Sequence, residues 1–200
     1  QTLDILWNHA DMFVLNVSSP NTPDLRELQE VDHLSSILSE CGRISERRGG
    51  GKPLLLKLSP DSTDDALLAS AQMAMRRGID GFVATNTTLH RPVPSNTKTR
   101  SVFAERGGLS GRPLQPRSAE VIRLLYEEAG SEVPIVGVGG IDSADSAWEA
   151  MTSGASLLQL YSAMVFKGPS VVSLIVKGLR RRMRDNGFLS IEEVVGYGNP

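Results

Sequence analysis

Hydrophobic residues in this chain gather in five short runs, and each run ends in polar residues. The runs are too continuous for half-exposed strands, so they predict five buried strands, at residues 12–17, 54–58, 81–88, 134–140 and 156–161. Between them, hydrophobic residues recur at helical spacing, which predicts helices at residues 28–47, 62–78, 116–129, 143–153 and 169–187. The third of the intervening stretches also contains a long segment without clear periodicity, residues 89–109, which is typical of a lid or a ligand-binding loop.

Strands that alternate with helices indicate a parallel sheet of βα units, either an open doubly wound sheet or part of a (β/α)8 barrel. Small residues and hydroxyls follow the fourth and fifth strands, at Gly139–Gly140 and Tyr161–Ser162, where barrels bind phosphate. The final glycine of a Gly-x-Gly-x-x-Gly dinucleotide motif is missing after Gly137. We therefore expect an α/β fold, a (β/α)8 TIM barrel of which this chain covers roughly the last five βα units.

The first residues agree with this expectation. Residues 2–7 resemble the tail of a helix, and the chain has no initiator Met, so we expect residue 1 to lie inside a domain. Residues 1–200 would then be the C-terminal part of a single barrel domain whose first three strands are absent. Within the second βα unit, Ser62 followed three residues later by Asp65 is typical of a capping box and predicts the start of a helix.

Composition narrows the classes of function. The chain has 40% hydrophobic and 22% charged residues, an ordinary balance for a globular protein. A net charge of -2 supplies no field that would attract nucleic acid, so no nucleic-acid partner is expected. Cys41 is the only cysteine, which excludes an internal disulfide, and no run of 18 apolar residues is present. The three histidines are scattered, so no metal site is expected.

Polar groups at the strand ends are the candidates for chemistry. The stretch Asn16–Thr22 has six polar or turn-forming residues directly after an apolar run. The carboxyl ends of parallel strands meet at the sheet edge where α/β folds bind ligands, so we expect these groups to line a site. Lys57 lies among leucines near the end of a buried strand, where its ammonium is costly to bury without an anionic or electron-rich partner. Thr85, Asn86 and Thr87 offer neutral donors and acceptors that suit a planar, imide-like ligand.

A glycine-rich segment, Gly107–Gly111, allows backbone amides to approach a ligand closely and contributes Ser110. Together with the small residues after the last two strands, it indicates a phosphorylated cofactor. A lysine near a ring and amides around a phosphate would suit flavin mononucleotide (FMN). Two other hypotheses remain open: another phosphate-binding barrel, a lyase or isomerase that uses Lys57 as a Schiff-base amine, and an incomplete, non-catalytic barrel fragment.

The order and spacing of these motifs resemble dihydroorotate dehydrogenase over nearly the whole chain. The motifs are Asn16-Val-Ser-Ser-Pro-Asn-Thr22, Lys57 in Leu-Lys-Leu-Ser-Pro, Thr85-Asn-Thr-Thr88, Gly107-Gly-Leu-Ser-Gly111 with Pro113-Leu114, Val136-Gly-Val-Gly-Gly140 and Gln159-Leu-Tyr161. The resemblance implies an FMN-dependent barrel that oxidises dihydroorotate to orotate in pyrimidine (UMP) biosynthesis.

The resemblance also implies roles for individual residues. Ser19 would be the base that removes a proton from C5 of dihydroorotate while hydride leaves C6 for flavin N5, and Thr22 would pass that proton on through water. Lys57 would lie near flavin N1 and the C2 carbonyl. The implied substrate-binding residues are Asn16, Asn21, Asn86 and Thr87; the implied cofactor-binding residues are Asn16, Lys57, Thr85, Ser110, Gly111, Gly139, Gly140, Tyr161 and Ser162.

Ser19 also indicates the class within the family. Members of the soluble class carry Cys at this place, whereas the membrane-associated, quinone-using class carries Ser. The resemblance thus implies quinone as electron acceptor and peripheral membrane association through a helical segment that this chain lacks. The expected location is the inner membrane, on its cytoplasmic face in bacteria or in the mitochondrion of a eukaryote. Ser162 stands where the family usually has Thr, which preserves the hydroxyl.

Overall fold

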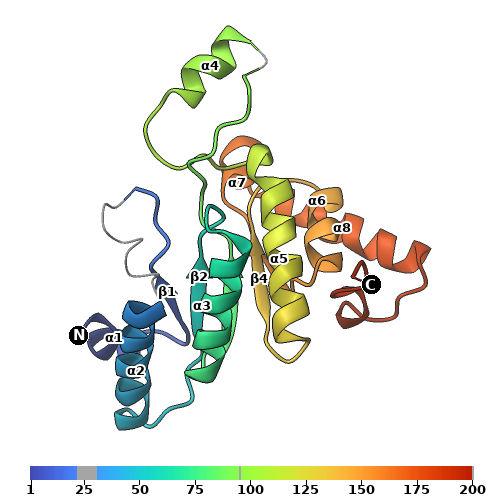
Figure 1. Cartoon of the computed structure of the whole chain (residues 1–200). Coiled ribbons are helices and arrows are strands. Elements are labelled where there is room, and N and C mark those ends of the chain that lie inside the picture. The colour runs from blue at the N-terminus through green and yellow to red at the C-terminus, as the bar shows by residue number, and fades with distance from the viewer. Residues whose placement is uncertain (22–30, 95, 200) are drawn as a thin grey trace.

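The computed structural model describes residues 1–21, 31–94 and 96–199, and its centre is a parallel sheet of five strands. The strands follow one another across the sheet in chain order, β1 to β5, without a reversal (Figure 1). Doubly wound sheets reverse their strand order at a switch point, so this order is the order of a barrel. The strands are β1 (Phe13–Asn16), β2 (Leu54–Leu58), β3 (Gly81–Ala84), β4 (Ile135–Val138) and β5 (Leu157–Gln159).

Helices precede and follow the strands in the manner of consecutive βα units. Helix α1 (Thr2–Leu6) and the short helix η1 (Trp7–His9) come before β1. The other helices are α2 (Val31–Arg47), α3 (Asp64–Arg76), α4 (Thr97–Phe103), η3 (Arg112–Leu114), α5 (Gln115–Ala129), α6 (Ala144–Thr152), α7 (Ser162–Lys167), α8 (Ser170–Asp185) and η4 (Glu192–Val194). None of the helices in the described part of the chain is both long and apolar enough to cross a membrane.

The core lies between the sheet and the helices on one of its faces. Leu56 and Phe82 from the strands are fully buried there, together with Leu67 of α3 and Leu125 of α5. Burying each such side chain stabilises the fold by about 1.5–3 kcal/mol. The opposite face of the sheet has a smaller cluster of Leu55, Val83 and Val136, which corresponds to the interior of a barrel.

Strand β1 differs from the prediction, because the sequence pattern indicated a buried strand and the structure shows a half-exposed one. Its side chains alternate between partly buried and exposed, and Val14 is 40% exposed. The reason is its position, since β1 is an edge strand that pairs only with β2 among the described residues. Strand β5, at the other edge of the sheet, departs from the predicted burial in the same way, because its Leu157 is 62% exposed. Continuous apolar sequence predicts burial on both faces only for a strand with neighbours on both sides.

The start of helix α3 also differs from the prediction, by one residue. The cap of α3 is Thr63, whose Oγ1 accepts a hydrogen bond from the backbone N–H of Ala66, and not Ser62. The predicted helix from residue 28 begins at Val31 in the described part of the chain, and residues 22–30 lie outside that part. Two short helices, α4 and α7, were not predicted at all. Both have few buried side chains, so hydrophobic periodicity does not reveal them.

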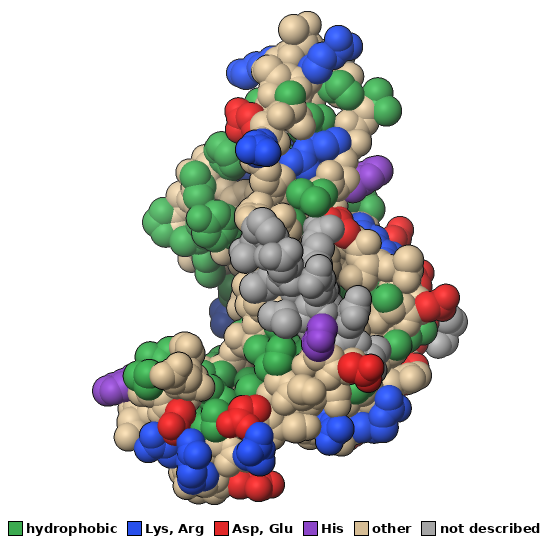
Figure 2. Space-filling view, turned by 60° about the vertical axis from the view of Figure 1, so that its left-hand side comes forward, with side chains coloured by type: hydrophobic (Ala, Val, Ile, Leu, Met, Phe, Trp, Pro, Cys, Tyr) green, Lys and Arg blue, Asp and Glu red, His purple; other side chains and the backbone are tan. Residues whose placement is uncertain are grey.

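The segment after β3 forms an arm, defined here as residues 89–94 and 96–108. Figure 1 shows α4 at its far end, away from the sheet and the other helices. None of the residues of α4 is buried, and Asn96 caps the helix by accepting a hydrogen bond from the backbone N–H of Thr99. In Figure 2 the arm stands clear at the top of the molecule and carries basic side chains. The arm therefore contributes nothing to the core, although its root lies at the site described next.

Candidate active site

A cavity of about 960 Å³ lies at the carboxyl ends of the strands, as the polar strand ends predicted. Ten of the predicted site residues line it: Lys57, Thr85, Asn86, Thr87, Ser110, Gly111, Gly139, Gly140, Tyr161 and Ser162. Three others, Asn16, Ser19 and Asn21, lie at the neighbouring exit of β1, and hydrogen bonds connect Asn16 and Asn21 to the cavity wall. Thr22, the predicted proton relay, lies outside the described residues.

A chain of hydrogen bonds fixes the orientation of two side-chain amides at this exit. The backbone N–H of Thr87 donates to Asn86 Oδ1 at 2.8 Å, and a backbone N–H can only donate. The Asn86 Nδ2 group therefore faces the other way, and it donates to Asn16 Oδ1 and Ser18 Oγ, each at 3.1 Å. Asn16 Oδ1 also accepts from Ser18 Oγ at 3.2 Å. With its oxygen occupied, Asn16 presents its NH₂ group as a donor.

The amide of Asn21 is oriented in the same manner by a different element. The backbone N–H of Gly108, at the root of the arm, donates to Asn21 Oδ1 at 2.9 Å. Gly108 approaches this closely because it has no side chain; a Cβ there would lie 1.9 Å from Thr87 Oγ1 and 2.9 Å from Pro20 Cγ. Asn21 thus also has its oxygen engaged and its NH₂ group available. Two amide donors at the end of β1 suit a ligand with several oxygen acceptors.

Ser19 lies between these two amides in the sequence and is partly exposed. Its Oγ accepts a hydrogen bond from the backbone N–H of Asn21 at 3.3 Å. A donor aimed at this oxygen stabilises the negative charge that develops when the hydroxyl loses its proton. The arrangement is compatible with the predicted role of Ser19 as a base.

Lys57 lies between the amides and the glycine-rich loops. Its strand position is paired with Asn16 on one side and Val83 on the other. The side chain is half-buried, and its ammonium makes no hydrogen bond or ion pair with any residue that the structure describes. Burial lowers the pKa of Lys57 from its ordinary value. A half-buried ammonium without a partner among the described residues fits a site that receives an electron-rich or anionic group.

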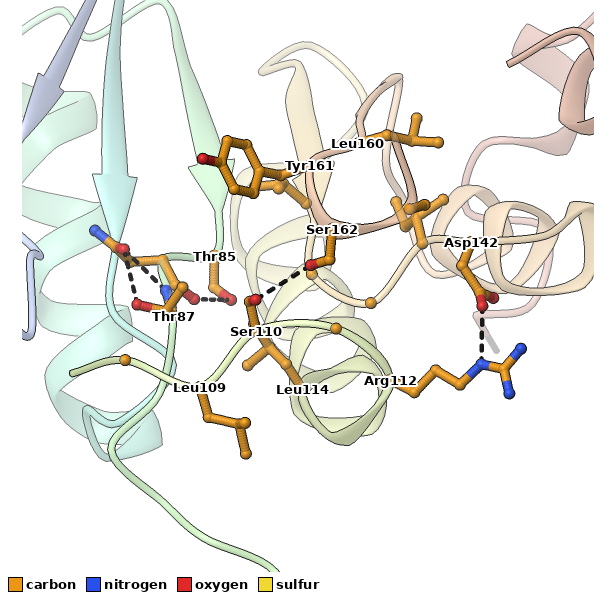
Figure 3. A pocket seen from close by; sticks show the side chains of 18 of the residues that line it. Thr85, Thr87, Leu109, Ser110, Arg112, Leu114, Asp142, Leu160, Tyr161 and Ser162 are labelled. Carbon is orange, nitrogen blue, oxygen red and sulfur yellow. Dashed lines mark hydrogen bonds and ion pairs between the residues drawn. The ribbon is translucent and has the colours of Figure 1, made fainter. Parts of the chain in front are cut away.

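The far end of the cavity is built from loops that bring backbone close to backbone. Gly140 has φ +72°, and a Cβ there would lie 2.8 Å from the carbonyl oxygen of Gly111. In Figure 3, Ser110 and Ser162 point toward each other across the cavity, and Ser162 Oγ donates to Ser110 Oγ at 3.1 Å. Two hydroxyls and glycine loops at the ends of the last two strands form a suitable cradle for a phosphate group.

A charged group that the sequence did not reveal closes this end. Asp142 Oδ2 accepts from Arg112 Nε at 2.8 Å and from Lys167 Nζ at 3.0 Å, which joins η3 to α7 (Figure 3 shows the Arg112 contact). Burial raises the pKa of Asp142, but the hydrogen bonds and charges of Lys167 and Arg112 outweigh burial and lower that pKa overall. Because the three residues are far apart in the sequence, no local pattern predicted their contact.

Two more residues at the site were missed. Ser18 is fully buried and contacts both Asn16 and Asn86, although it stands inside the motif that the sequence singled out. Arg91 lines the cavity from the root of the arm. The signal for Ser18 was available, since it lies two residues beyond Asn16 and so shares its side of an extended chain.

The strand order and the polar strand ends define a class of protein, a (β/α)8 barrel with a ligand-binding cavity at the carboxyl ends of its strands. Comparison with known proteins specifies this class further. A family model described as dihydroorotate dehydrogenase matches residues 1–183. The chain belongs to the dihydroorotate dehydrogenase family.

Curated relatives agree with this family. The chain is 42% identical over 205 residues to dihydroorotate dehydrogenase (quinone) of Trichodesmium erythraeum (strain IMS101), a match that covers 100% of this chain and 53% of the relative. It is 45% identical to dihydroorotate dehydrogenase (quinone) of Natronomonas pharaonis, over 98% of this chain and 53% of the relative. The chain therefore spans about half the length of the curated relatives it matches. The predicted resemblance to the C-terminal portion of the quinone-dependent class is confirmed.

Solved structures support the fold in the same way. The crystal structure of DHODH in complex with ferulenol from Eimeria tenella matches 100% of this chain and 57% of its own, with a TM-score of 0.90 and 32% sequence identity. The ligand-free form from the same organism matches 98% of this chain with a TM-score of 0.88 and 31% identity. The predicted fold class, a (β/α)8 barrel of which the chain forms five βα units, is confirmed.

Proposed function

We propose that this chain carries the cofactor and substrate sites of a quinone-dependent dihydroorotate dehydrogenase, which oxidises dihydroorotate to orotate in pyrimidine biosynthesis. One observation carries the proposal. The ammonium of Lys57, half-buried and without a described protein partner, stands between two oriented amides on one side and a glycine-lined phosphate cradle on the other. This order of groups suits a ring system with a phosphate at one end and a small oxygen-rich substrate at the other.

The residues of the cavity fit FMN. The phosphate would lie among the glycine loops and hydroxyls, and the ring would extend toward Lys57 and the polar end of β3. The proposed cofactor-binding residues are Asn16, Lys57, Thr85, Ser110, Gly111, Gly139, Gly140, Tyr161 and Ser162. When bound, FMN supplies an acceptor for the hydride that leaves the substrate.

The amides at the exit of β1 suit dihydroorotate, whose carboxylate and ring carbonyls are acceptors. Asn16 and Asn21 each have the carbonyl oxygen occupied by protein donors, so their NH₂ groups would face the substrate. Asn86 fixes the orientation of Asn16, and Thr87 supplies the backbone N–H that fixes Asn86. Together these four residues would hold the substrate ring in one orientation, which is the main requirement for removing one particular proton.

In the proposed reaction Ser19 takes the proton from C5 of dihydroorotate, and a hydride leaves C6. The substrate thereby loses two electrons and two hydrogens and becomes orotate, and a quinone finally receives the electrons. The backbone N–H of Asn21 would stabilise the Ser19 oxygen as its own proton departs. The role of Thr22 in passing the proton on stays a prediction.

The wider setting is part of the same proposal. Residues 1–200 would belong to a single FMN-binding barrel domain. Because quinones reside in lipid, an enzyme that reduces them would associate with the inner membrane at its periphery.

The test is the visible absorption spectrum of the purified protein with FMN, recorded before and after anaerobic addition of dihydroorotate. We expect a bound flavin whose absorbance bleaches with dihydroorotate. Dihydrouracil, which lacks the carboxylate, is the matched control and should leave the flavin oxidised. A bound flavin that dihydroorotate fails to bleach would contradict the proposed substrate, and Schiff-base trapping of a substrate on Lys57 would favour a different reaction class.

A further inference from the structure

Arg91 connects the two sides of the arm, between its root at Thr88 and the end of α4 at Phe103. Its guanidinium donates to five backbone carbonyls, two on the outgoing side and three on the returning side. Four of the contacts are Nη1 to Thr88 O at 3.0 Å, Nε to Phe103 O at 3.1 Å, and Nη1 to His90 O and Nη2 to Glu105 O at 3.4 Å each. The fifth acceptor is the carbonyl of Gly107. A guanidinium has five N–H groups, so this set can engage all of them.

Because its donors are engaged by the protein, Arg91 has none left for a ligand, although it lines the cavity. We infer that Arg91 is a positioning residue for substrate binding, which acts through Gly107 and Gly108. This inference rests on the proposed function, since it assigns Arg91 to the substrate end of that site.

The path from Arg91 to the substrate end is short. Arg91 holds the carbonyl of Gly107, and the next residue, Gly108, donates its N–H to Asn21 Oδ1 at 2.9 Å. Gly108 also packs directly against Thr87 and Pro20, with no room for a Cβ. If the returning side of the arm shifted at Gly107 and Gly108, the Asn21 amide would lose its fixed orientation. The loop that carries Ser19 would be disturbed as well. The orientation of Asn16 would be less affected, because Asn86 and Thr87 fix it independently.

Other contacts hold the arm when Arg91 is changed. Thr88 and Leu109 form an isolated antiparallel bridge, with N–O distances of 3.1 and 2.7 Å. On the outer side, Asp61 accepts from the Thr88 hydroxyl and from the backbone N–H of Leu89, the latter at 2.9 Å. Loss of Arg91 should thus loosen the returning side of the arm, while the arm stays attached and the barrel stays folded. The expected defect is local and concerns substrate affinity.

The test compares Arg91→Lys with Arg100→Lys in the flavin-loaded protein. Both changes keep the charge, but a lysine has three donors on one nitrogen and cannot span the two sides of the arm. Arg100 lies exposed on α4 and is the matched control. Two quantities are measured: hydrogen exchange of peptides covering residues 17–21 and 107–109, and the dissociation constant of orotate by calorimetry.

For Arg91→Lys we expect faster hydrogen exchange in both peptides and a dissociation constant of orotate raised about tenfold. A change of this size corresponds to one or two hydrogen-bonding groups that are no longer held in position. Flavin content should be unchanged, and Arg100→Lys should behave as the wild type. Unchanged exchange at residues 17–21 together with unchanged orotate affinity would overturn the inference. Faster exchange in a protein whose wild type binds no orotate would instead uphold the positioning contact and reject the proposed function.

A second variant protects the test against a folding failure. Gly108→Ala leaves Arg91 intact but places a Cβ against Thr87, so it should weaken orotate binding at least as much as Arg91→Lys. Wild-type orotate affinity in Gly108→Ala would show that the Gly108 contact is dispensable and would overturn the inference.

Discussion

The two ends of the candidate site would recognise their proposed ligands by different means. At the exit of β1, side-chain amides would supply the hydrogen-bond donors. The orientation of each amide is fixed by a donor from another segment of the chain. At the exits of β4 and β5, recognition depends on positions where no side chain fits, such as Gly140, with two hydroxyls facing each other nearby. The first end depends on the orientation of side-chain amides, and the second on the close approach of backbone loops.

The difference predicts how each end fails. Changes at the β1 end should alter substrate binding or chemistry and leave the flavin in place. Changes at the glycine end should release the flavin, because a Cβ added at Gly140 would clash with Gln115 and the Gly111 carbonyl and shift the loops proposed to hold the phosphate. Lys57, between the two ends, should affect both.

The largest effect should come from Ser19→Ala, which tests the substrate end. Removing a catalytic base lowers a rate by about 10²–10⁴-fold. The rate of flavin reduction by dihydroorotate near neutral pH should therefore fall by a factor in that range or larger. Flavin content should not change. Anaerobic stopped-flow absorbance measures the rate, and Ser19→Cys, whose thiol loses its proton more readily than a hydroxyl, should recover part of it. A normal rate in Ser19→Ala would remove Ser19 from the role of base.

Next in size is Gly140→Ala, which tests the phosphate end. The new Cβ would lie 2.8 Å from the Gly111 carbonyl oxygen, at a φ of +72° that alanine rarely adopts. The substitution would create a strain of about 1–3 kcal/mol, and the loop would have to shift to relieve it. This shift should weaken FMN binding by roughly 10- to 100-fold in a fluorescence titration. Gly42→Ala is the control, since Gly42 lies in α2 with open space around it. Equal FMN affinity in both variants would refute the cradle.

A smaller effect, on both ends, is expected from Lys57→Met. Burial lowers the pKa of Lys57, and an electron-rich ligand would raise it again, so the wild type should bind FMN less well as the pH rises through that lowered value. Lys57→Met should bind FMN more weakly or be reduced more slowly, and should lose this part of the pH dependence. Lys177→Met, on the exposed side of α8, serves as control. An unchanged pH profile in Lys57→Met would point to a purely structural lysine.

The smallest effect concerns the contact that joins η3 to α7. Despite burial, the partners of Asp142 lower its pKa below the ordinary value of 3.8. A lowered folded-state pKa stabilises the fold at pH values above 3.8, and this stabilisation disappears as the pH falls through the folded-state value. Asp142→Asn should therefore lower the melting temperature by a few degrees near pH 7 and by less at about pH 3. Asp145→Asn, which removes an exposed ion pair with Arg182, is the control. Equal losses at both pH values would contradict the assignment.

The parts of the fold that the sequence predicted are those set by local pattern. Strands β2 to β5 and the helices α3, α5, α6 and α8 have clear hydrophobic patterns, and polar residues mark the strand ends because the core stops there. Lys57 was identified for a similar reason, since a charge inside a leucine run conflicts with its surroundings. These features follow from a few neighbouring residues, and a single sequence is sufficient to find them.

What the sequence did not predict depends on contacts between distant segments. The exposure of Val14 follows from which strands pair with β1, and no local pattern contains that information. The orientation of the Asn21 amide requires Gly108, which is 87 positions away in the chain. Helix α4 was missed because a side-chain cap and not a hydrophobic face starts it.

The closed root of the arm has a consequence for engineering. Thr88 and Leu109 are neighbours in space, so the intervening chain is a loop whose ends are already joined. The entropy of closing such a loop grows only slowly with its length, so extra residues within the arm would cost the fold little. Val93 is 93% exposed and marks a place for such an insertion. An affinity peptide or a fluorescent label inserted there would report on the protein while the barrel and its cofactor loops remain as they are.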